Sequence, residues 1–317
     1  MGIFWTAVLF LAGLVLIVKG GDWFLDGAVW MAEITGVPRF VIGATVVSLA
    51  TTLPELTVSA AGVLKGETDL AVGNAVGSVS ANLGLILGLS AVCLPAAVDR
   101  RQFPLKALLM VSAAGLLLFL CRGGTLPAAS GLALLAVFIL YMVSSLRDAR
   151  NGRKERRGRS GRRRASPGQT AEKLLLFALG VAGIITGSQL LIDYGSRLAL
   201  LLGVPAGIIG VTLVAVGTSL PELVTTLAAI ARKEASMSVG NIVGANVIDL
   251  TLILPVCAVL SGGGLTIGPQ TTGLDLPVCL ALAAAAVLPP LIRGRFYRWQ
   301  GALLLAVYGF YMVRLIS

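Results

Sequence analysis

Long apolar segments recur along the whole chain, separated by short polar stretches. Each segment is close to the roughly 20 residues that an α-helix needs to cross a bilayer. A short amphipathic piece near 23–36 continues the first of them. The pattern predicts ten spans, at 3–18, 37–64, 70–94, 105–121, 126–146, 174–192, 204–231, 235–260, 274–292 and 299–316.

These spans predict an all-α polytopic membrane protein. Only helices and closed barrels satisfy their backbone hydrogen bonds in lipid, and these runs are too long and continuous for barrel strands. Composition agrees, because 13% of the residues are charged against roughly a quarter in soluble domains. No basic residue precedes the first run and no small-residue cleavage signature follows it, so we interpret it as a retained span.

Most of the positive charge lies in one segment. Residues 147–173 carry 11 Lys or Arg against 3 Asp or Glu, which supplies +8 of the net +10. The segment is polar and predicted to be a disordered loop. A cytoplasmic loop that sets the topology explains this charge better than nucleic-acid binding does.

The other basic residues predict the orientation. With 147–173 inside, 20 basic residues fall inside and 4 outside, as the positive-inside rule requires. The outside residues are Lys65, Arg122, Arg197 and Arg314. We therefore expect a multi-pass protein of the inner (plasma) membrane with both termini extracytoplasmic.

Histidine and cysteine narrow the chemistry. The chain contains no histidine, which excludes a His-dependent zinc motif and a histidine proton relay. Its four cysteines lie in or beside apolar spans with no Cys-x-x-Cys pair, and we interpret them as packing residues. They are Cys93, Cys121, Cys257 and Cys279.

The chain contains an internal repeat. A shift of 167 residues places "VPRFVIGATVVSLATTLPE" (37–55) on "VPAGIIGVTLVAVGTSLPE" (204–222), with ten of nineteen positions identical. The halves are predicted at 1–146 and 174–317, joined by the loop 147–173. Five spans per half is an odd number, so the second copy must be inverted. Inverted repeats with broken helices predict a secondary transporter with its site near the midplane.

Each copy of the repeated stretch places a proline and a glutamate inside an apolar run. The proline removes a backbone donor, which is expected to free carbonyls near Ser48 and near Ala215. Helical spacing gathers Ser48, Thr51, Thr52 and Glu55 on one face. The second copy offers Ala215, Thr218, Ser219 and Glu222. All of these groups are hard oxygen donors, the ligand class that Ca²⁺, Mg²⁺ and Na⁺ select.

The spans that follow the breaks add polar side chains at four-residue spacing, which places each set on one helical face. The sets are Asn74, Ser78 and Asn82, and Asn241, Ala245 and Asp249. Gly-x-x-x-Gly pairs in the same segments predict close helix approach.

The buried acids need compensation, because a carboxylate inside a membrane costs about 2.5–3.5 kcal/mol on insertion scales. No Lys or Arg occurs in 40–64, 66–99, 198–231 or 234–292. Two explanations remain. The carboxylates are partly protonated, because burial and repulsion disfavour their charged form, or a mobile cation neutralises them. A cation site is the favoured hypothesis, and protonation of one acid, Asp249, is compatible with it.

At these motifs the chain resembles the sodium/calcium exchanger family of the cation/calcium antiporter superfamily. The two "SLPE"-type breaks and the "GN-x-x-G" helices are similar to the family's two alpha repeats. The resemblance implies ten helices, with the second, third, seventh and eighth lining the ion site. It implies these ligands: Glu55, Glu222, Ser48, Thr51, Thr52, Ala215, Thr218, Ser219, Ser78, Asn82 and Asp249.

Three positions depart from the family pattern. Ala50-Thr51-Thr52 stands where Gly-Thr-Ser is usual, which keeps the hydroxyl but adds bulk. Ala245 stands where serine is usual opposite Ser78, which removes one oxygen. Ser48 stands opposite Ala215, and a carbonyl ligand is available from either residue.

The resulting hypothesis is an antiporter, not an enzyme, that exchanges Ca²⁺ for Na⁺ by alternating access. It needs no cofactor, and its partners are inorganic cations and the lipid bilayer, without nucleic acid or an obligate protein partner. The alternative is a proton-coupled calcium or cation antiporter, which Ala245 favours. A channel would not need an inverted repeat in which Asn82 matches Asp249. An intramembrane protease would use aspartates in a Gly-x-Gly-Asp context, which is absent.

Overall fold

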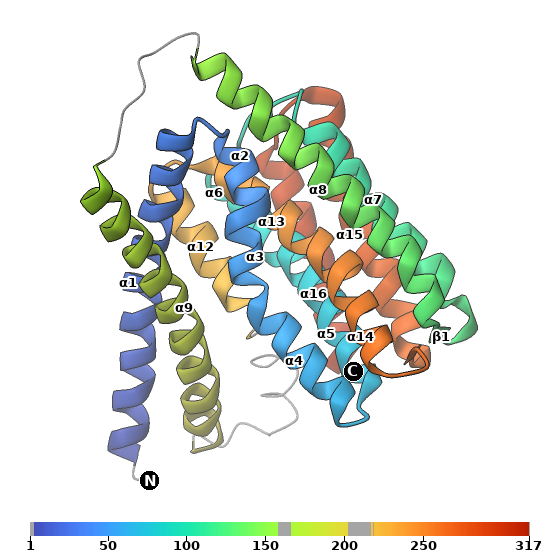
Figure 1. The fold of residues 1–317 in the computed structure, drawn as a ribbon. Helices are drawn as coiled ribbons and strands as arrows, with labels where there is room; N and C mark the ends of the chain where they lie inside the picture. Colours follow the sequence, from blue (N-terminus) through green and yellow to red (C-terminus); the bar gives the residue numbers. More distant parts are fainter. Residues whose placement is uncertain (1–2, 158–165, 202–216, 218, 317) are drawn as a thin grey trace.

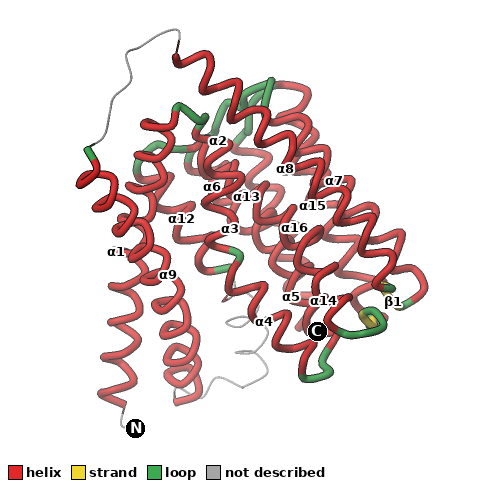
Figure 2. Tube along the Cα trace, viewed as in Figure 1, coloured by secondary structure: helices red, strands yellow, loops and turns green. Residues whose placement is uncertain are grey.

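The part of the chain that the structure describes folds almost entirely into helices. The computed structural model describes residues 3–157, 166–201, 217 and 219–316, and Figures 1 and 2 show these as helices joined by short loops. Seven helices within those ranges are long and apolar enough to cross a membrane, and one bent pair forms an eighth candidate. The predicted all-α polytopic architecture is therefore confirmed. The predicted span 204–231 falls partly on 202–216 and 218, outside the described residues.

The elements up to the polar segment alternate regular helices with π-helical turns. In chain order they are α1 (Ile3–Thr35), α2 (Arg39–Ile42), the π-helical η1 (Gly43–Val47), α3 (Ser48–Thr51), α4 (Leu53–Leu64), α5 (Thr68–Ala81), the π-helical η2 (Asn82–Leu87), α6 (Gly88–Cys93), α7 (Phe103–Leu120), the 3₁₀ turn η3 (Cys121–Gly123), β1 (Thr125–Leu126) and α8 (Ala128–Arg157).

The elements after the polar segment repeat this arrangement. They are α9 (Pro167–Leu201), α12 (Leu220–Ala231), α13 (Ala235–Ile248), the π-helical η5 (Asp249–Ile253), α14 (Leu254–Leu260), β2 (Leu265–Thr266), the π-helical η6 (Thr271–Asp275), α15 (Leu276–Arg293) and α16 (Arg298–Ile316). Helices α4 and α12, and likewise α5 and α13, begin and end 167 residues apart. The repeat seen in the sequence is thus also a repeat of elements.

The second span is broken in its middle. Its two parts, Arg39–Thr51 and Leu53–Leu64, meet at an angle of 42°. Pro54 lies in the first turn of α4, where the missing N–H has no intrahelical partner to lose. Pro221 takes the same place in α12. The proline therefore starts a new helix at this depth instead of merely kinking an old one.

Two helices extend beyond the predicted spans. Helix α1 runs for 33 residues, so the amphipathic piece near 23–36 continues the first span as predicted. Helix α8 continues to Arg157 and α9 begins at Pro167, so both ends of the predicted loop 147–173 are helical. Hydropathy reports where lipid ends, whereas Arg, Lys and Glu are good helix formers that sustain a helix in water.

Helices α1 and α9 pack against each other in antiparallel directions, at one side of the molecule in Figure 1. Glycines allow this close approach: a Cβ at Gly20 would lie 2.9 Å from the Gly180 carbonyl oxygen, and one at Gly187 would lie 2.8 Å from that of Gly13. Because α9 occupies the place of α1 in the repeat, the opposite directions of the two helices agree with an inverted second copy.

The central layer consists of α5–α6 and α13–α14, whose residues are mostly buried, whereas α1, α8 and α9 are largely exposed at the periphery. Short loop contacts connect the two halves at both ends. Strand β1 pairs antiparallel with β2, with Thr125 opposite Thr266. At the other end Ala97 forms a bridge with Arg295. These contacts enclose the central helices, which carry the candidate site.

Candidate ion-binding site

The two glutamates of the repeated motif begin two helices inside the molecule. Glu55 lies in the first turn of α4 and Glu222 in the first turn of α12. Both side chains are buried, with 1% and 0% exposed. The N-terminus of a helix carries partial positive charge and free N–H groups, which favour an anionic side chain there. The breaks thus create two places where a buried carboxylate is tolerated.

A third carboxylate, Asp249, is the first residue of η5 and is fully buried. Within the described residues no Lys or Arg pairs with the oxygens of Glu55, Glu222 or Asp249. The contacts to the two glutamates come from their own backbone N–H groups and, for Glu222, also from the Thr51 hydroxyl. The ion pairs found there involve other acids. Electrostatic repulsion acts between Glu222 and each of the other two. The site is therefore an uncompensated concentration of acceptor oxygens.

The hydroxyl groups of the first break are buried, but they are occupied locally. Thr52 Oγ1 donates to the Ser48 carbonyl oxygen at 2.7 Å and Thr51 Oγ1 contacts the same oxygen at 3.3 Å. The Thr52 backbone N–H donates to it as well. The Ser48 hydroxyl donates to the Thr45 carbonyl oxygen at 3.2 Å. The carbonyl that the sequence predicted to be freed at Ser48 is thus satisfied by the chain itself in this conformation.

The second break is described only in part. Ser219 is buried, and its hydroxyl has no partner within the described residues. The predicted ligands Ala215 and Thr218 lie outside the described residues. On this side the structure accordingly contributes Ser219 and Glu222 to the site.

The packed helices bring the remaining predicted ligands into the interior. Ser78, Asn82 and Asp249 are each at most 1% exposed. The π-helical segment η2 begins at Asn82 and η5 begins at its counterpart Asp249. Such π-helical turns are rare and frequent at functional sites, because they alter the direction of a side chain within a helix. Asn82 and Asp249, which the repeat places at equivalent positions, thus each begin a π-helical segment.

Close packing holds α13 against the first broken helix. A Cβ at Gly240 would lie 2.2 Å from the Phe40 carbonyl oxygen, and one at Gly244 would lie 2.5 Å from Ser48 Oγ. The close approach predicted from this glycine pair is confirmed. Added Cβ atoms at the matching Gly73 and Gly77 meet no described atom within 4 Å.

An amide network connects the two halves at the site. Asn241 Nδ2 donates to Thr225 Oγ1 at 3.0 Å, and Thr51 Oγ1 contacts Asn241 Oδ1 at 3.4 Å. In the first half Asn74 Nδ2 donates to Ser59 Oγ at 3.0 Å. The four-residue spacing predicted that both asparagines face the site. It did not identify Thr225, which has Val58 as its counterpart.

The sequence pattern did not identify another buried asparagine, Asn246. Asn246 is fully buried and accepts a hydrogen bond from Asn82 Nδ2 at 3.1 Å. Its counterpart in the first half is Val79. Neither the repeat nor the four-residue spacing singles out this position, because the polar group occurs in one copy only.

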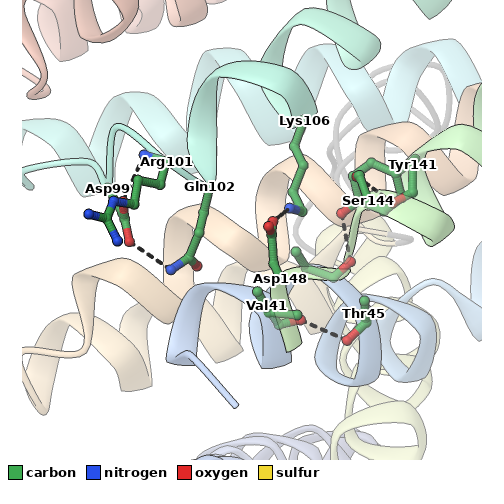
Figure 3. Close-up of polar contacts among 10 residues, drawn as sticks. Val41, Thr45, Asp99, Arg101, Gln102, Lys106, Tyr141, Ser144 and Asp148 are labelled. Carbon is green, nitrogen blue, oxygen red and sulfur yellow. Dashed lines mark hydrogen bonds and ion pairs between the residues drawn. The ribbon is translucent and has the colours of Figure 1, made fainter. Parts of the chain in front are cut away.

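A polar cluster supports the first broken helix from outside the site (Figure 3). Tyr141 donates to the Ala44 carbonyl oxygen at 2.6 Å, and Thr45 donates to that of Val41 at 2.7 Å. Lys106 pairs with Asp148 (Figure 3). Lys106 is one of the 20 basic residues predicted to lie inside, and it is buried in α7 instead of lying in a loop. It is neutralised by Asp148, not by the acids of the site.

The donor set limits the kind of ion that fits. No group of three or more His, Cys, Asp or Glu side chains able to hold a metal occurs within the described ranges. Carboxylates must therefore be supplemented by hydroxyl, amide or carbonyl oxygens. Such a mixed oxygen set suits Na⁺ or Ca²⁺ and not soft transition metals.

Comparison with known proteins agrees with this arrangement. The family model "Sodium/calcium exchanger protein" matches residues 5–147 and 172–317. The inner membrane protein YrbG of Escherichia coli (strain K12) is 34% identical over 88% of this chain and 86% of its own length. Sodium/calcium exchanger MaX1 of Methanosarcina acetivorans is 30% identical over 96% and 97%.

The fold is similar to that of a solved exchanger. A structure of the sodium-calcium exchanger NCX_Mj soaked with Na⁺ and Sr²⁺ superposes with a TM-score of 0.83 and 31% identity, covering 98% of this chain and 99% of that one. Another structure of the same exchanger was soaked with Na⁺ and Ca²⁺. The match over nearly the full length includes both halves and the central helices described above.

Proposed function

Because the chain belongs to the sodium/calcium exchanger family of membrane transporters, we propose that it is a secondary active antiporter that exchanges Ca²⁺ for Na⁺. The observation that carries this proposal is that three carboxylates, Glu55, Glu222 and Asp249, are buried and that no described Lys or Arg forms an ion pair with them. Buried charges are costly unless they are paired, and a mobile cation supplies the missing charge.

Shared glutamates provide the coupling. Two glutamates neutralise one Ca²⁺ or two Na⁺, and the hydroxyl and amide oxygens of Thr51, Ser78 and Asn82 complete either shell. Filling the pocket with Na⁺ excludes Ca²⁺, and the reverse also holds. Exchange follows when the two halves, 1–146 and 174–317, change conformation only with balanced charge, so that the midplane site opens to one side at a time.

The orientation proposed is that of an inner (plasma) membrane protein with both termini extracytoplasmic and 147–173 cytoplasmic. The charge bias across the loops supports it, and a relative of 34% identity is named an inner membrane protein. The aqueous ions on both sides are the partners of the transport cycle.

A proton-coupled calcium or cation antiporter is the second candidate. Ala245 is buried beside the site where the first half carries Ser78, so one hydroxyl ligand is missing from the second half. With fewer oxygen ligands, the site is expected to bind fewer Na⁺ ions. Carboxylates can carry protons in place of Na⁺ without any histidine.

Radiolabelled Ca²⁺ uptake into proteoliposomes tests both candidates. An outward Na⁺ gradient is expected to drive Ca²⁺ accumulation. Uptake that ignores Na⁺ but follows a pH gradient would instead support proton coupling. Uptake in the absence of any counter-gradient would contradict an antiporter and support a channel.

A further inference from the structure

The orientation of one candidate ligand is set by a residue outside the ligand set. The side-chain amide of Asn82 has two unlike ends, an oxygen that accepts and an NH₂ group that donates. Only the oxygen can bind a cation. A buried amide at this place therefore contributes to the site in one of its two orientations and opposes a cation in the other.

The hydrogen bonds around Asn82 select between these orientations. Asn82 Nδ2 donates to Asn246 Oδ1 at 3.1 Å. Asn82 Oδ1 is buried and has no hydrogen-bond partner within the part of the chain that the structure describes. The NH₂ group is thus engaged by α13, and the oxygen is the end left available to a cation.

Asn246 is itself held in one orientation. Its Nδ2 donates to Met110 Sδ at 3.6 Å. A thioether sulfur accepts hydrogen bonds but cannot donate them. Met110 therefore requires the NH₂ end of Asn246 on its side, which leaves Asn246 Oδ1 facing Asn82. All three side chains are at most 1% exposed, so in this conformation they are shielded from bulk solvent.

The repeat explains why this arrangement occurs only once. The counterpart of Asn82 is Asp249, whose two carboxylate oxygens both accept. An aspartate needs no neighbour to select its oxygen, and the counterpart of Asn246 is the apolar Val79. Asn82, an amide, therefore has the amide Asn246 beside it. Asp249, a carboxylate, has no corresponding amide because Val79 stands at the position equivalent to Asn246.

From this geometry we propose that Asn246, oriented by Met110, is a positioning residue that turns the Asn82 carbonyl oxygen toward the transported cation. The proposal rests on the proposed function, since it presumes a cation at this site. It adds a second helix, α13, to the control of a ligand on η2. The hydrogen bond from Asn82 in the first half to Asn246 in the second half would then lie beside the bound cation.

The test measures Ca²⁺ binding by purified protein in detergent, with ⁴⁵Ca²⁺, in a double-mutant cycle. Asn246→Leu is expected to raise the half-saturating Ca²⁺ concentration about tenfold, as for one impaired ligand. In an Asn82→Asp background, where either oxygen of the carboxylate binds, the same substitution is expected to change it less than about twofold. A merely structural effect would cost the same in both backgrounds.

Two further variants separate positioning from packing. Met110→Leu conserves volume and removes only the sulfur acceptor, so it folds and weakens Ca²⁺ binding by about two- to threefold. Gln300→Leu is the matched control. This buried amide donates to the Ala285 and Ala286 carbonyl oxygens and forms no hydrogen bond with a described candidate ligand, so Ca²⁺ affinity is expected to stay unchanged.

The outcomes distinguish this inference from the function on which it rests. Wild-type protein that binds neither Ca²⁺ nor Na⁺ would overturn the proposed function and this inference with it. Wild-type binding that persists unchanged in Asn246→Leu, or that falls equally in both Asn82 backgrounds, would overturn the positioning role alone. Loss confined to the Asn82 background supports it.

Discussion

A few buried charged side chains dominate the proposed site, because burying a charge inside a membrane protein is costly unless it is compensated. Glu55 and Glu222 stand where new helices begin, and the helix N-termini lower the cost of burying each charge. Removing the charge while keeping the shape separates its electrostatic role from packing. A substitution that removes the charge but keeps the shape is equally informative at Asp249, which lies in the middle of a continuous span.

Glu55→Gln and Glu222→Gln are each expected to reduce Ca²⁺ uptake to background. Each removes one of the two charges that balance a divalent cation, and an amide cannot replace that charge. Asp69→Asn is the matched control, because Asp69 lies exposed in the first turn of α5 and should transport normally. Proteoliposome flux measures all three. Wild-type flux in either glutamine variant would remove these residues from the site.

Asp249→Asn is expected to keep part of the exchange activity. Asn82 stands at the equivalent position of the other half, so an amide oxygen is already among the proposed ligands. Loss of one charge-assisted contact predicts a rate about tenfold lower. Flux under a Na⁺ gradient and under a pH gradient measures the effect. Complete loss under both gradients would show that the carboxylate itself is required.

At the level of elements, the broken helices and the helices packed on them act together. Backbone contact between α13 and the first broken helix is closer than any side chain would allow, so glycine is required at Gly240. The π-helical turns at Asn82 and Asp249 alter side-chain directions without ending the helices. The geometry of the site therefore depends on how tightly two spans approach.

Gly240→Ala is expected to separate α13 from α2 and to impair both stability and transport. The added Cβ would meet the Phe40 carbonyl oxygen at 2.2 Å, which requires the backbone to move. Gly309→Ala is the control, since that helical glycine in α16 meets no described atom within 4 Å. The control should be neutral or stabilising by about 0.5–1 kcal/mol. Thermal unfolding in detergent and Ca²⁺ flux compare them, and equal behaviour would contradict the packing argument.

The ion pair between α7 and α8 predicts a stability effect remote from the ligands. Lys106 is buried, with its ammonium 5.7 Å from the centre of the Phe40 ring. Asp148→Ala leaves this charge unpaired, and we expect a loss of about 3 kcal/mol, the lower end of the range because Asp148 is partly exposed. The double variant Lys106→Met with Asp148→Leu should recover most of it.

An exposed ion pair provides the control for that measurement. Glu33 pairs with Arg39 at 3.5 Å, and both side chains are more than 40% exposed. Glu33→Ala is expected to cost less than about 1 kcal/mol. A drop in Tm as large as that of Asp148→Ala would show that burial of Lys106 is not the cause.

For the whole molecule, the contacts between loops agree with the proposed orientation. The pairs β1 with β2 and Thr68 with Thr266 join segments that the charge bias places outside. Ala97 with Arg295, and Arg39 with Glu234, join segments that it places inside. The orientation is set by charge, and it can be measured with the native cysteines.

Cys93 reports the orientation. It is exposed at the end of α6, whereas Cys121, Cys257 and Cys279 are buried. A membrane-impermeant maleimide is expected to label Cys93 in inside-out vesicles and not in right-side-out ones. A Lys65→Cys substitution in a Cys93→Ser background should show the opposite pattern, because Lys65 is expected outside. Labelling of Cys93 in right-side-out vesicles would reverse the assignment.

Much of this molecule follows from the sequence because the bilayer imposes a simple rule. Apolar length defines the spans, basic residues define the expected sides, and the repeat doubles the evidence at each motif. Glu55, Glu222 and the pair Asn82 and Asp249 were recognisable because each has a partner 167 residues away. The helical fold and a secondary transporter with inverted repeats followed from that pattern, whereas the exchanger family was indicated by the resemblance of the two motifs to its alpha repeats.

The tertiary structure decided what has no counterpart in the repeat. Asn246 and Thr225 occur in one half only, Lys106 is paired with Asp148, and α8 continues beyond the predicted span to Arg157. Hydropathy and periodicity describe neighbours along one helix. Hydrogen bonds between helices far apart in sequence depend on where those helices meet and on which end of each amide faces the other, and only folding brings these groups together.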